Sequence, residues 1–384
     1  MNTDTASPSQ ADIEQERSRL ASNLGCALRD IRRFSSSPAL AGAAQAEEPD
    51  FHWDAYRDTR YAHEIPGLGG LLHVFQQEWV GIRAAAGSLP GRKLAIKSDA
   101  LHSRRAIKTL VGAIRDAAPQ RILMQGMSDA MGQLVDELAA QGMRDHVFVV
   151  LHGAPSQWFS GPEARHAFRC LELARTGKIQ RLHVMKAGFE FPEPRLYRPM
   201  LFNLPPRLSA EDSGEGIETG DCGSVLIPGW SGWRKNIHTN ALGAALSTRV
   251  KEVWAFGSDL ALPPPLNSKI RIVPFSGREQ TFDLIKKASL AMNVSLVDCH
   301  PMVHLEVQAL GKACLRGPLF LDALEEHPYV RLTEVADVSS PAAIRDAVDR
   351  VLDVPSEDRR QLVRDYQAAN DHVAVQRYRE FLEL

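Results

Sequence analysis

Two acidic residues, Asp298 and Glu306, are separated by seven residues in the segment 288–318, ASLAMNVSLVDCHPMVHLEVQALGKACLRGP. The segment begins as an apolar strand that Asp298 closes and restarts as a helix with one buried face. Residues at the carboxyl end of a parallel strand and in the next helix face the crevice where α/β sheets bind ligands. Carboxylates there accept hydrogen bonds from hydroxyl groups, and a helix N-terminus attracts phosphate. The spacing therefore predicts a polyhydroxylated ligand that carries phosphate.

The composition excludes several other classes of protein. With 384 residues the chain is long enough for two domains of about 150 residues, and a net charge of −2 gives no basic excess for nucleic acid. The five cysteines are scattered without a Cys-x-x-Cys pair, which indicates neither a disulfide framework nor a zinc site. The sequence shows no apolar run of about 18 residues and no signal peptide, so we expect a reduced, cytoplasmic protein.

Strands alternate with helices of about 10 to 15 residues through most of the chain, a pattern typical of βαβ units and parallel sheets. It predicts an α/β fold with two doubly wound, Rossmann-like domains that face each other across a cleft. We expect the first domain at 51–205, a linker at 206–221 and the second domain at 222–355. Residues 356–384 are predicted to be helical. Whether these helices cross back to the first domain is left open. Predicted C-terminal helix starts are Ser340, Ser356 and Asp371.

Residues 1–50 read as a tail that contains an amphipathic helix at about 13–34, in which Leu20, Leu24 and Leu28 recur at helical spacing. This helix either binds a membrane surface or a partner protein, or packs on its own domain. A glycine-rich turn, 67–70, comes directly before a helical pattern at 71–87. Glycines there allow a ligand to approach the backbone, or form a plain tight turn.

The segment NVSLVDCHPMVHLEVQALGKACLRGP resembles the C-terminal motif of the retaining GT-B glycosyltransferases, specifically glycosyltransferase family 4 and its relatives. That motif has two acidic residues separated by seven, and Asp298 and Glu306 occupy these positions. The resemblance continues through PGWSGWRKNIHTNALGAA, where Lys235 matches the family lysine that pairs with the nucleotide diphosphate. It is weaker but in the same order over 65–206, where GLGG, LHG and LFNLPP match family segments.

The resemblance implies roles for the residues of the second domain. Glu306 would hold the ribose hydroxyls of a nucleotide sugar, and Asp298 would lie against the donor sugar. Lys235, with Arg234 beside it, would neutralise the diphosphate leaving group as its charge grows. Pro301 and Met302 belong to the same donor-binding set. No metal and no cofactor beyond the nucleotide sugar are expected.

From the first domain, the resemblance implies that His152 reaches the donor sugar and that Gly69 and Gly70 bring backbone amides to the phosphate. His152, Asp298 and Lys235 are therefore the expected catalytic residues. The implied enzyme is a hexosyltransferase-like glycosyltransferase that retains anomeric configuration. Its acceptor would be a glycan, a lipid-linked molecule or a protein, in bacterial surface polysaccharide synthesis, in the cytoplasm or at the inner membrane surface.

Three departures from the family pattern leave other functions open. Asp298 replaces a glutamate, His300 and Pro301 replace Phe-Gly, and Trp230 stands where the family has an arginine. Proline offers no amide hydrogen to a ligand. One alternative is an inactive GT-B scaffold or binding protein, and another is a sugar-nucleotide epimerase. Function belongs to the site rather than to the fold, so only binding and activity can separate these alternatives.

Overall fold

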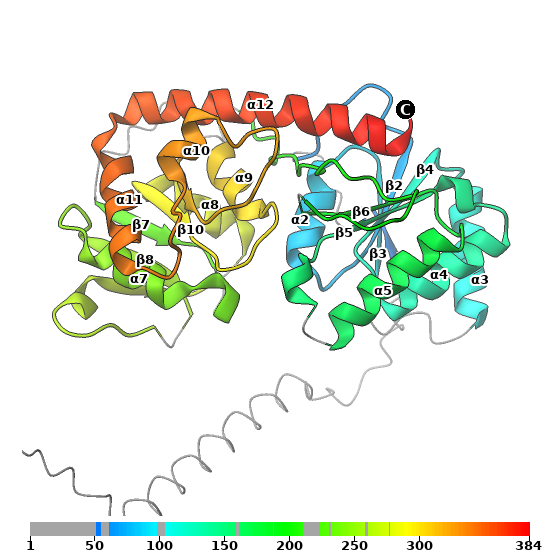
Figure 1. The fold of residues 1–384 in the computed structure, drawn as a ribbon, viewed down its shortest axis with the longest axis horizontal. Helices are drawn as coiled ribbons and strands as arrows, with labels where there is room; N and C mark the ends of the chain where they lie inside the picture. Colours follow the sequence, from blue (N-terminus) through cyan, green and yellow to red (C-terminus); the bar gives the residue numbers. More distant parts are fainter. Residues whose placement is uncertain are drawn as a thin grey trace, which may run out of the picture. The chain divides into compact units, whose positions relative to one another are not determined.

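The computed structural model describes residues 51–54, 61–97, 104–158, 161–186, 188–209, 223–229, 232–257, 260–275 and 277–384. Two sheets with helices packed on their faces form two α/β domains (Figure 1). This is the fold class that the alternating pattern predicts. The predicted helix at 13–34, Trp230 and residues 210–221 of the predicted linker lie outside the described residues. The predicted domain limits stay predictions.

The first sheet has six strands in the order β1-β3-β2-β4-β5-β6. Its central strands are apolar over nearly their whole length, as expected for strands covered on both faces. All pairs are parallel except β1, which runs antiparallel to β3 at the edge. The strands are β1 (Phe51–Trp53), β2 (Leu71–Gln76), β3 (Arg92–Ile96), β4 (Arg121–Gln125), β5 (Val147–Leu151) and β6 (Arg181–Val184).

The second sheet has five parallel strands in the order β11-β10-β7-β8-β9. The chain moves from β7 outward to β8 and β9, then returns to the other side of β7 with β10. The order therefore reverses between β7 and β10, and ligands of open α/β sheets bind at such a switch point. The strands are β7 (Ser224–Ile227), β8 (Glu252–Phe256), β9 (Ile270–Val273), β10 (Leu290–Asn293) and β11 (Cys314–Arg316).

Helices connect and cover these strands (Figure 1). In the first domain they are α2 (Val80–Ser88), α3 (Arg104–Asp116), α4 (Asp129–Ala140) and α5 (Gly161–Arg175). The others are α7 (Ile237–Leu246), α8 (Arg278–Lys287), α9 (Met302–Ala309), α10 (Pro328–Thr333), α11 (Pro341–Asp353) and α12 (Ser356–Leu382). A short 3-10 turn, η3 (Trp233–Lys235), precedes α7.

Two predicted elements are wrong. The glycine turn at 67–70 precedes a strand, β2, and the helix α2 begins only at Val80. The run LLHVFQ is buried at every position, and a short run without alternation cannot be separated from a helix by periodicity, which explains the error. No helix begins at Asp371, because α12 continues through it as one helix of 27 residues. The Asp371 carboxyl lies partly buried near His63, and burial raises its pKa.

The long helix α12 packs on both domains, crossing above them in Figure 1. Near its start, the ring of Tyr366 lies 4.7 Å from that of Tyr329 in the second domain. Near its end, the ring of Phe381 lies 5.5 Å from that of Phe148 in the first sheet. Arg121 at the start of β4 also donates a 3.0 Å hydrogen bond to the Leu382 carbonyl. These contacts join the two domains through one continuous helix.

Ser340 caps α11, as the sequence predicts, because its hydroxyl accepts a 3.2 Å hydrogen bond from the Ala343 amide. We expect Ser340→Ala to lower the free energy of unfolding by about 1 kcal/mol, the usual contribution of such a cap. Urea denaturation measures the change. Ser356→Ala is the matched control, since Ser356 is exposed at the start of α12, which no side chain caps. Equal losses in the two variants would contradict a capping role.

Candidate active site between the two sheets

Lys235 and Asp298 meet at the switch point of the second sheet. Lys235 follows β7 and Asp298 follows β10, and the lysine Nζ lies 2.6 Å from the Asp298 carboxylate. The two side chains are only 18% and 13% exposed. Burial favours protonation of Asp298, but the Lys235 ammonium outweighs it and holds the pKa of Asp298 below its usual value. The pair is therefore charged and shielded from most solvent.

The loop that carries Asp298 differs from the prediction. Strand β10 ends at Asn293, so Asp298 lies five residues beyond it in a loop and does not close the strand. Asn240 of α7 draws the chain away from the sheet, donating to the Val294 carbonyl at 3.0 Å and accepting from the Val294 amide at 3.0 Å. The Leu296 amide then donates to the Arg234 carbonyl at 2.8 Å. These bonds fix the Asp298 loop against the Lys235 loop.

Asn236, directly after Lys235, sets the direction of that second loop. Its backbone is left-handed, with φ of 54°, a conformation that asparagine tolerates better than most residues. Its side-chain amide donates to the Val338 carbonyl at 2.6 Å. The turn thereby ends η3 and starts α7 with Lys235 held over the carboxyl edge of the sheet. The Arg234 guanidinium makes no hydrogen bond or ion pair with other described residues, so it can bind an anion.

Glu306, in the second turn of α9, forms a 2.9 Å ion pair with Arg278 at the start of α8. The glutamate is 14% exposed, and burial raises its pKa although the Arg278 charge opposes the rise. The guanidinium carbon of Arg278 lies 4.4 Å from the ring centre of Tyr61 and 5.2 Å from that of Phe282. Each of the two carboxylates predicted for the ligand site thus faces a cation of this chain.

Pro301 and Met302 form the start of α9. Pro301 is its N-cap and no side chain caps the helix, so its first amide groups remain available to an anion. The Met302 side chain is buried against Ala85 of α2 and Leu305, which leaves only its backbone to contact a ligand. His300, one of the predicted departures, is buried and its Nδ1 accepts a 2.9 Å hydrogen bond from the Asn203 amide.

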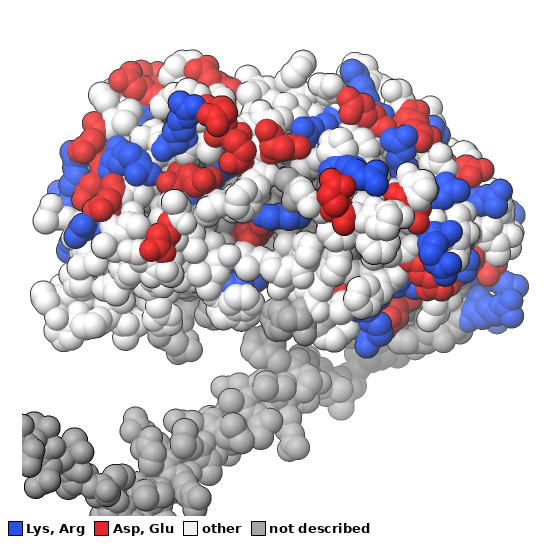
Figure 2. Space-filling model, viewed as in Figure 1, with Lys and Arg blue, Asp and Glu red and all other residues white. Residues whose placement is uncertain are grey.

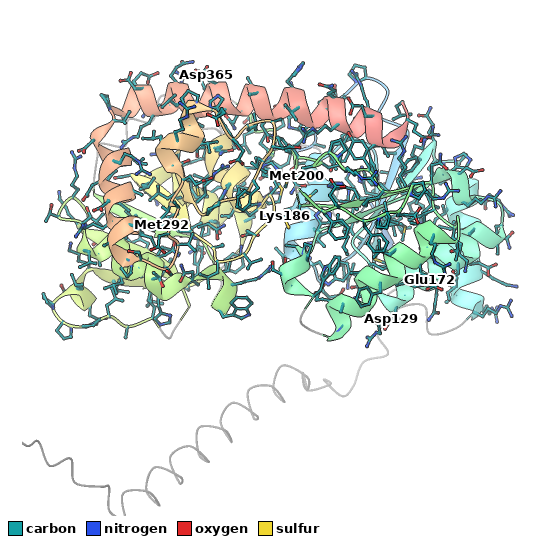
Figure 3. The ribbon with its side chains drawn as sticks, in the orientation of Figure 1. Asp129, Glu172, Lys186, Met200, Met292 and Asp365 are labelled. Carbon is teal, nitrogen blue, oxygen red and sulfur yellow. The ribbon has the colours of Figure 1, made fainter. Side chains whose placement is uncertain are left out.

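Residues of the first domain reach this loop directly. Lys186, after β6, donates to the carbonyls of Asp298 at 3.2 Å and Leu319 at 3.1 Å. Figure 3 labels Lys186 between the two domains. The thiol of Cys299 lies 3.4 Å from the carbonyl of His152, which follows β5. The carboxyl edges of the two sheets therefore face each other here, with His152 on the first sheet and the loops of Lys235 and Asp298 on the second, where the sequence predicts the crevice.

His152 is held by a side chain of the neighbouring strand. Its Nε2 lies 2.7 Å from Oε1 of Gln125, the last residue of β4. Burial lowers the pKa of His152 to about 3, with a smaller contribution from His183. His152 is consequently neutral near pH 7.

Gly69 and Gly70 are not brought to the crevice. They precede β2, whereas His152 follows β5, and the strands between them are parallel. The glycines therefore lie at the amino edge of the first sheet. A Cβ on Gly70 would come within 2.6 Å of the Gln120 side chain, so this glycine allows a close contact with the turn before β4. The sequence left two roles open for these glycines, a backbone approach by a ligand or a plain tight turn, and this placement favours the tight turn.

Several residues around the crevice were not predicted: Gln125, Lys186, Asn293 and Arg278. Asn293 donates to Asp298 at 3.3 Å and lies 3.0 Å from Nε2 of His304. One signal was present in the sequence, because Gln125 and Asn293 are polar residues at the ends of apolar strand runs. Lys186 lies in a connecting segment and Arg278 is the first residue of α8, and a cation carries no such signal at either place.

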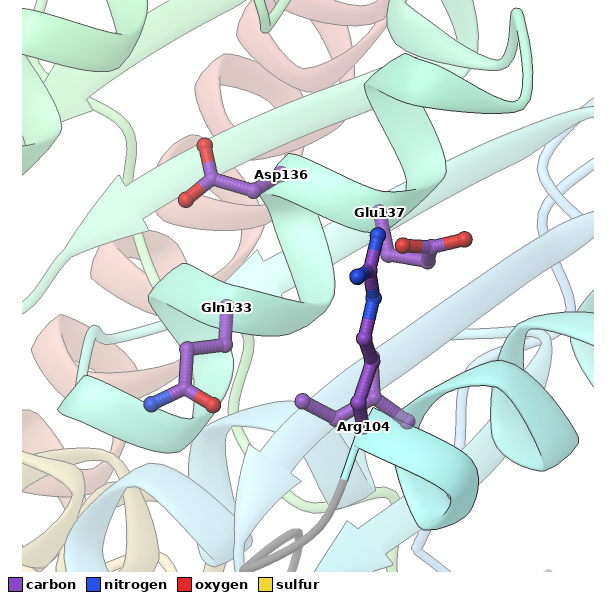
Figure 4. A pocket seen from close by; sticks show the side chains of 5 residues that line it. Arg104, Gln133, Asp136 and Glu137 are labelled. Atoms are coloured by element: carbon purple, nitrogen blue, oxygen red, sulfur yellow. The ribbon is translucent and has the colours of Figure 1, made fainter.

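Other surface features do not coincide with the crevice. A pocket of about 260 Å³ lies on α3 and α4, lined by Arg104, Ile107, Gln133, Asp136 and Glu137 (Figure 4). Figure 2 shows acidic and basic side chains interspersed over the visible face rather than one field of a single sign. None of the described helices is both long and apolar enough to cross a lipid bilayer.

No protein-family model matches the sequence, and no curated protein matches it. Solved structures do match in fold. A UDP-forming α,α-trehalose-phosphate synthase from Burkholderia xenovorans has a TM-score of 0.54 and 10% identity. The Anabaena protein HepE, solved with UDP and glucose, has 0.52 and 11%, and a sucrose-phosphate synthase from Thermosynechococcus elongatus has 0.50 and 12%. Each match covers 82% of this chain and 99% of the other. The chain therefore has the two-domain GT-B fold that its sequence predicts.

Proposed function

We propose that this protein is a glycosyltransferase that moves a sugar from a nucleotide-sugar donor to a sugar-containing acceptor. The observation that carries the proposal is the Lys235–Asp298 pair at the switch point of the second sheet, 2.6 Å apart, with His152 on the facing edge of the first sheet. Such a crevice offers cations to a leaving diphosphate and hydrogen-bonding groups to a sugar. One structural neighbour is a UDP-forming synthase and another was solved with UDP and glucose, which supports a nucleotide sugar as the donor.

In this proposal the second domain binds the donor. Arg234, Lys235 and the uncapped N-terminus of α9 at Met302 neutralise the diphosphate. Glu306 accepts hydrogen bonds from the ribose hydroxyls and exchanges part of its contact with Arg278 for them. Asp298, fixed by Lys235, lies beside the sugar.

We further propose that transfer retains the anomeric configuration and needs no metal ion, as in the family that the C-terminal motif resembles. The sugar would then pass through an oxocarbenium-like state while the diphosphate leaves, and the charge that develops on the diphosphate would be met by Lys235 and Arg234. The acceptor is a glycan, a lipid-linked molecule or a protein, and assembly of bacterial surface polysaccharide is the setting that we favour. Membrane contact through 13–34 belongs to the same proposal.

A thermal-shift screen with UDP-, GDP-, ADP- and TDP-linked sugars tests donor binding. A ligand at 100 times its Kd stabilises the folded protein by about 2.7 kcal/mol, which is visible as a higher melting temperature. We expect the sugars of one nucleotide to stabilise the protein, and UDP-linked sugars are the first candidates. The screen also selects the donor for assays of transfer and of hydrolysis.

The outcomes separate the alternatives. Slow donor hydrolysis without an acceptor, with release of nucleoside diphosphate, supports a transferase. Conversion of the donor into another intact nucleotide sugar would indicate an epimerase instead. The absence of any stabilisation would contradict the donor site and leave the scaffold function.

A further inference from the structure

Three buried polar residues lie beside one another in the first sheet, and two of them, His73 and Gln125, connect the Pro90 carbonyl to His152 by hydrogen bonds. Lys93 of β3 and His73 of β2 are opposite each other in the parallel register, and Gln125 is the last residue of β4. All three have at most 1% of their surface exposed. Buried polar groups are costly unless they are bonded, so the bonds that these residues make are well determined.

The connection begins at the carbonyl of Pro90. This oxygen accepts from Nε2 of His73 at 2.8 Å, and the Lys93 ammonium donates to the Leu89 and Gly91 carbonyls beside it, at 2.8 and 3.0 Å. A carbonyl oxygen only accepts, so Nε2 of His73 carries a proton. Burial, with the Lys93 charge, holds the pKa of His73 well below its usual value, so the ring is neutral and its Nδ1 is bare.

That bare nitrogen fixes the orientation of the Gln125 amide. Nδ1 of His73 lies 3.1 Å from the Gln125 Nε2 and can only accept, so the amide group must donate to it. The other end of the amide, Oε1, then faces Nε2 of His152 at 2.7 Å and accepts its proton. The opposite amide orientation would leave His73 without a proton for the Pro90 carbonyl. The Pro90 carbonyl therefore dictates which nitrogen of His152 carries hydrogen.

We propose that Gln125 and His73 are positioning residues that keep His152 in its Nε2-protonated tautomer, with Nδ1 as a hydrogen-bond acceptor for a ligand hydroxyl. Nδ1 of His152 makes no hydrogen bond with other described residues. The atom is also not fully buried, so a ligand can reach it. A neutral ring of this tautomer cannot donate a proton from Nδ1. His152 therefore selects a ligand group that donates, and it does not serve as a general acid.

The identity of that group rests on the proposed function, whereas the tautomer does not. In a glycosyltransferase the donating group is a sugar hydroxyl. A deoxy or fluoro substituent at the same carbon cannot donate, so such a donor is expected to bind more weakly. Loss of one neutral hydrogen bond amounts to roughly a tenfold change in kcat/KM.

Nitrogen-15 NMR of the histidine rings tests the tautomer without any substrate. In the wild type we expect His152 to show a protonated Nε2 and a bare Nδ1 from pH 5 to pH 8, with no titration. Gln125→Met removes the acceptor and should populate the Nδ1-protonated form. Gln125→Glu keeps an acceptor oxygen and adds a negative charge, so it should keep the tautomer and raise the pKa of His152. His152→Ala assigns the signal, and Gln133→Met, on the exposed face of α4, is the control.

Kinetics then tests the consequence for transfer. If Gln125 acts through His152, Gln125→Met should lower kcat/KM by about tenfold in the wild-type background and have no further effect in His152→Ala. Independent, multiplying losses would overturn the positioning role, as would a Nδ1-protonated His152 in the wild type. If no nucleotide sugar binds, the proposed function fails while the NMR result still decides the tautomer.

Discussion

Replacing Lys235 with Met is expected to lower kcat for sugar transfer by about 10²- to 10³-fold, the effect of losing one preorganised group that stabilises charge in a transition state. Lys235 is fixed 2.6 Å from Asp298, whereas the guanidinium of Arg234 beside it has no hydrogen-bond or ion-pair partner among the described residues. Initial rates with saturating donor measure the loss. A variant with unchanged kcat would remove Lys235 from the reaction.

The same substitution also affects folding, and a second variant separates the two effects. Lys235→Met leaves the buried Asp298 carboxylate unpaired, which costs about 3 to 5 kcal/mol in comparable buried pairs. Lys235→Met combined with Asp298→Asn removes both charges, so we expect stability to return while kcat stays low. Lys251→Met, at an exposed lysine before β8, should change neither quantity.

The pH of these measurements matters. The pKa of Asp298 is lowered in the folded state, so the pair adds stability above the unfolded pKa of about 3.9. That contribution is lost as the pH falls through the lower, folded-state pKa. Comparison at pH 7 therefore records the full difference between the variants.

Replacing Glu306 with Ala is expected to abolish the thermal stabilisation by the nucleotide sugar. A carboxylate that accepts from two ribose hydroxyls contributes about 1.5 to 3 kcal/mol for each charged hydrogen bond, so donor affinity should fall by at least 100-fold. Isothermal titration calorimetry measures the affinity directly. The expected change in kcat at saturating donor is smaller, because the ribose lies away from the reacting bond.

Two further variants test whether the loss of donor binding comes from Glu306 itself. Glu279→Ala removes an exposed carboxylate beside Arg278 in α8 and should leave donor binding intact. Arg278→Met frees Glu306 from its 2.9 Å ion pair. If donor binding survives Glu306→Ala but not Arg278→Met, the nucleotide is held by the arginine rather than by the glutamate.

The fold was predictable because its signal is local and repeated. Apolar runs such as VFVVL recur between amphipathic helices, and most of them form buried parallel strands, whereas the edge strand β9 is largely exposed. The placement of Asp298 and Glu306 after β10 follows the rule that the connection after a strand of an α/β sheet faces the ligand crevice, and their role as ligand-binding carboxylates stays a prediction. Their cationic partners were only half predictable. Lys235 belongs to a recognisable motif, whereas Arg278 reaches Glu306 from a helix start that carries no motif.

The errors arise where contacts distant in sequence decide the local structure. Strand β10 ends at Asn293 because Asn240, 54 residues earlier, takes the hydrogen bonds of Val294. The proposed tautomer of His152 depends on side chains of two other strands, His73 and Gln125, and on the Pro90 carbonyl, and no sequence window contains these groups together. The glycine turn was assigned to the phosphate from the family resemblance, and the run after it was taken for a helix, whereas the turn lies at the amino edge of the sheet.

The packing of α12 on both domains has a consequence for how the protein is made. Arg121 and its partner Leu382 are 261 residues apart, so β4 emerges from the ribosome long before the helix end that covers it. At about 5 to 20 residues per second, that interval is roughly 13 to 50 s. During this time the apolar surface around Phe148 has no Phe381 to cover it. The nascent first domain should therefore bind chaperones until α12 has been translated.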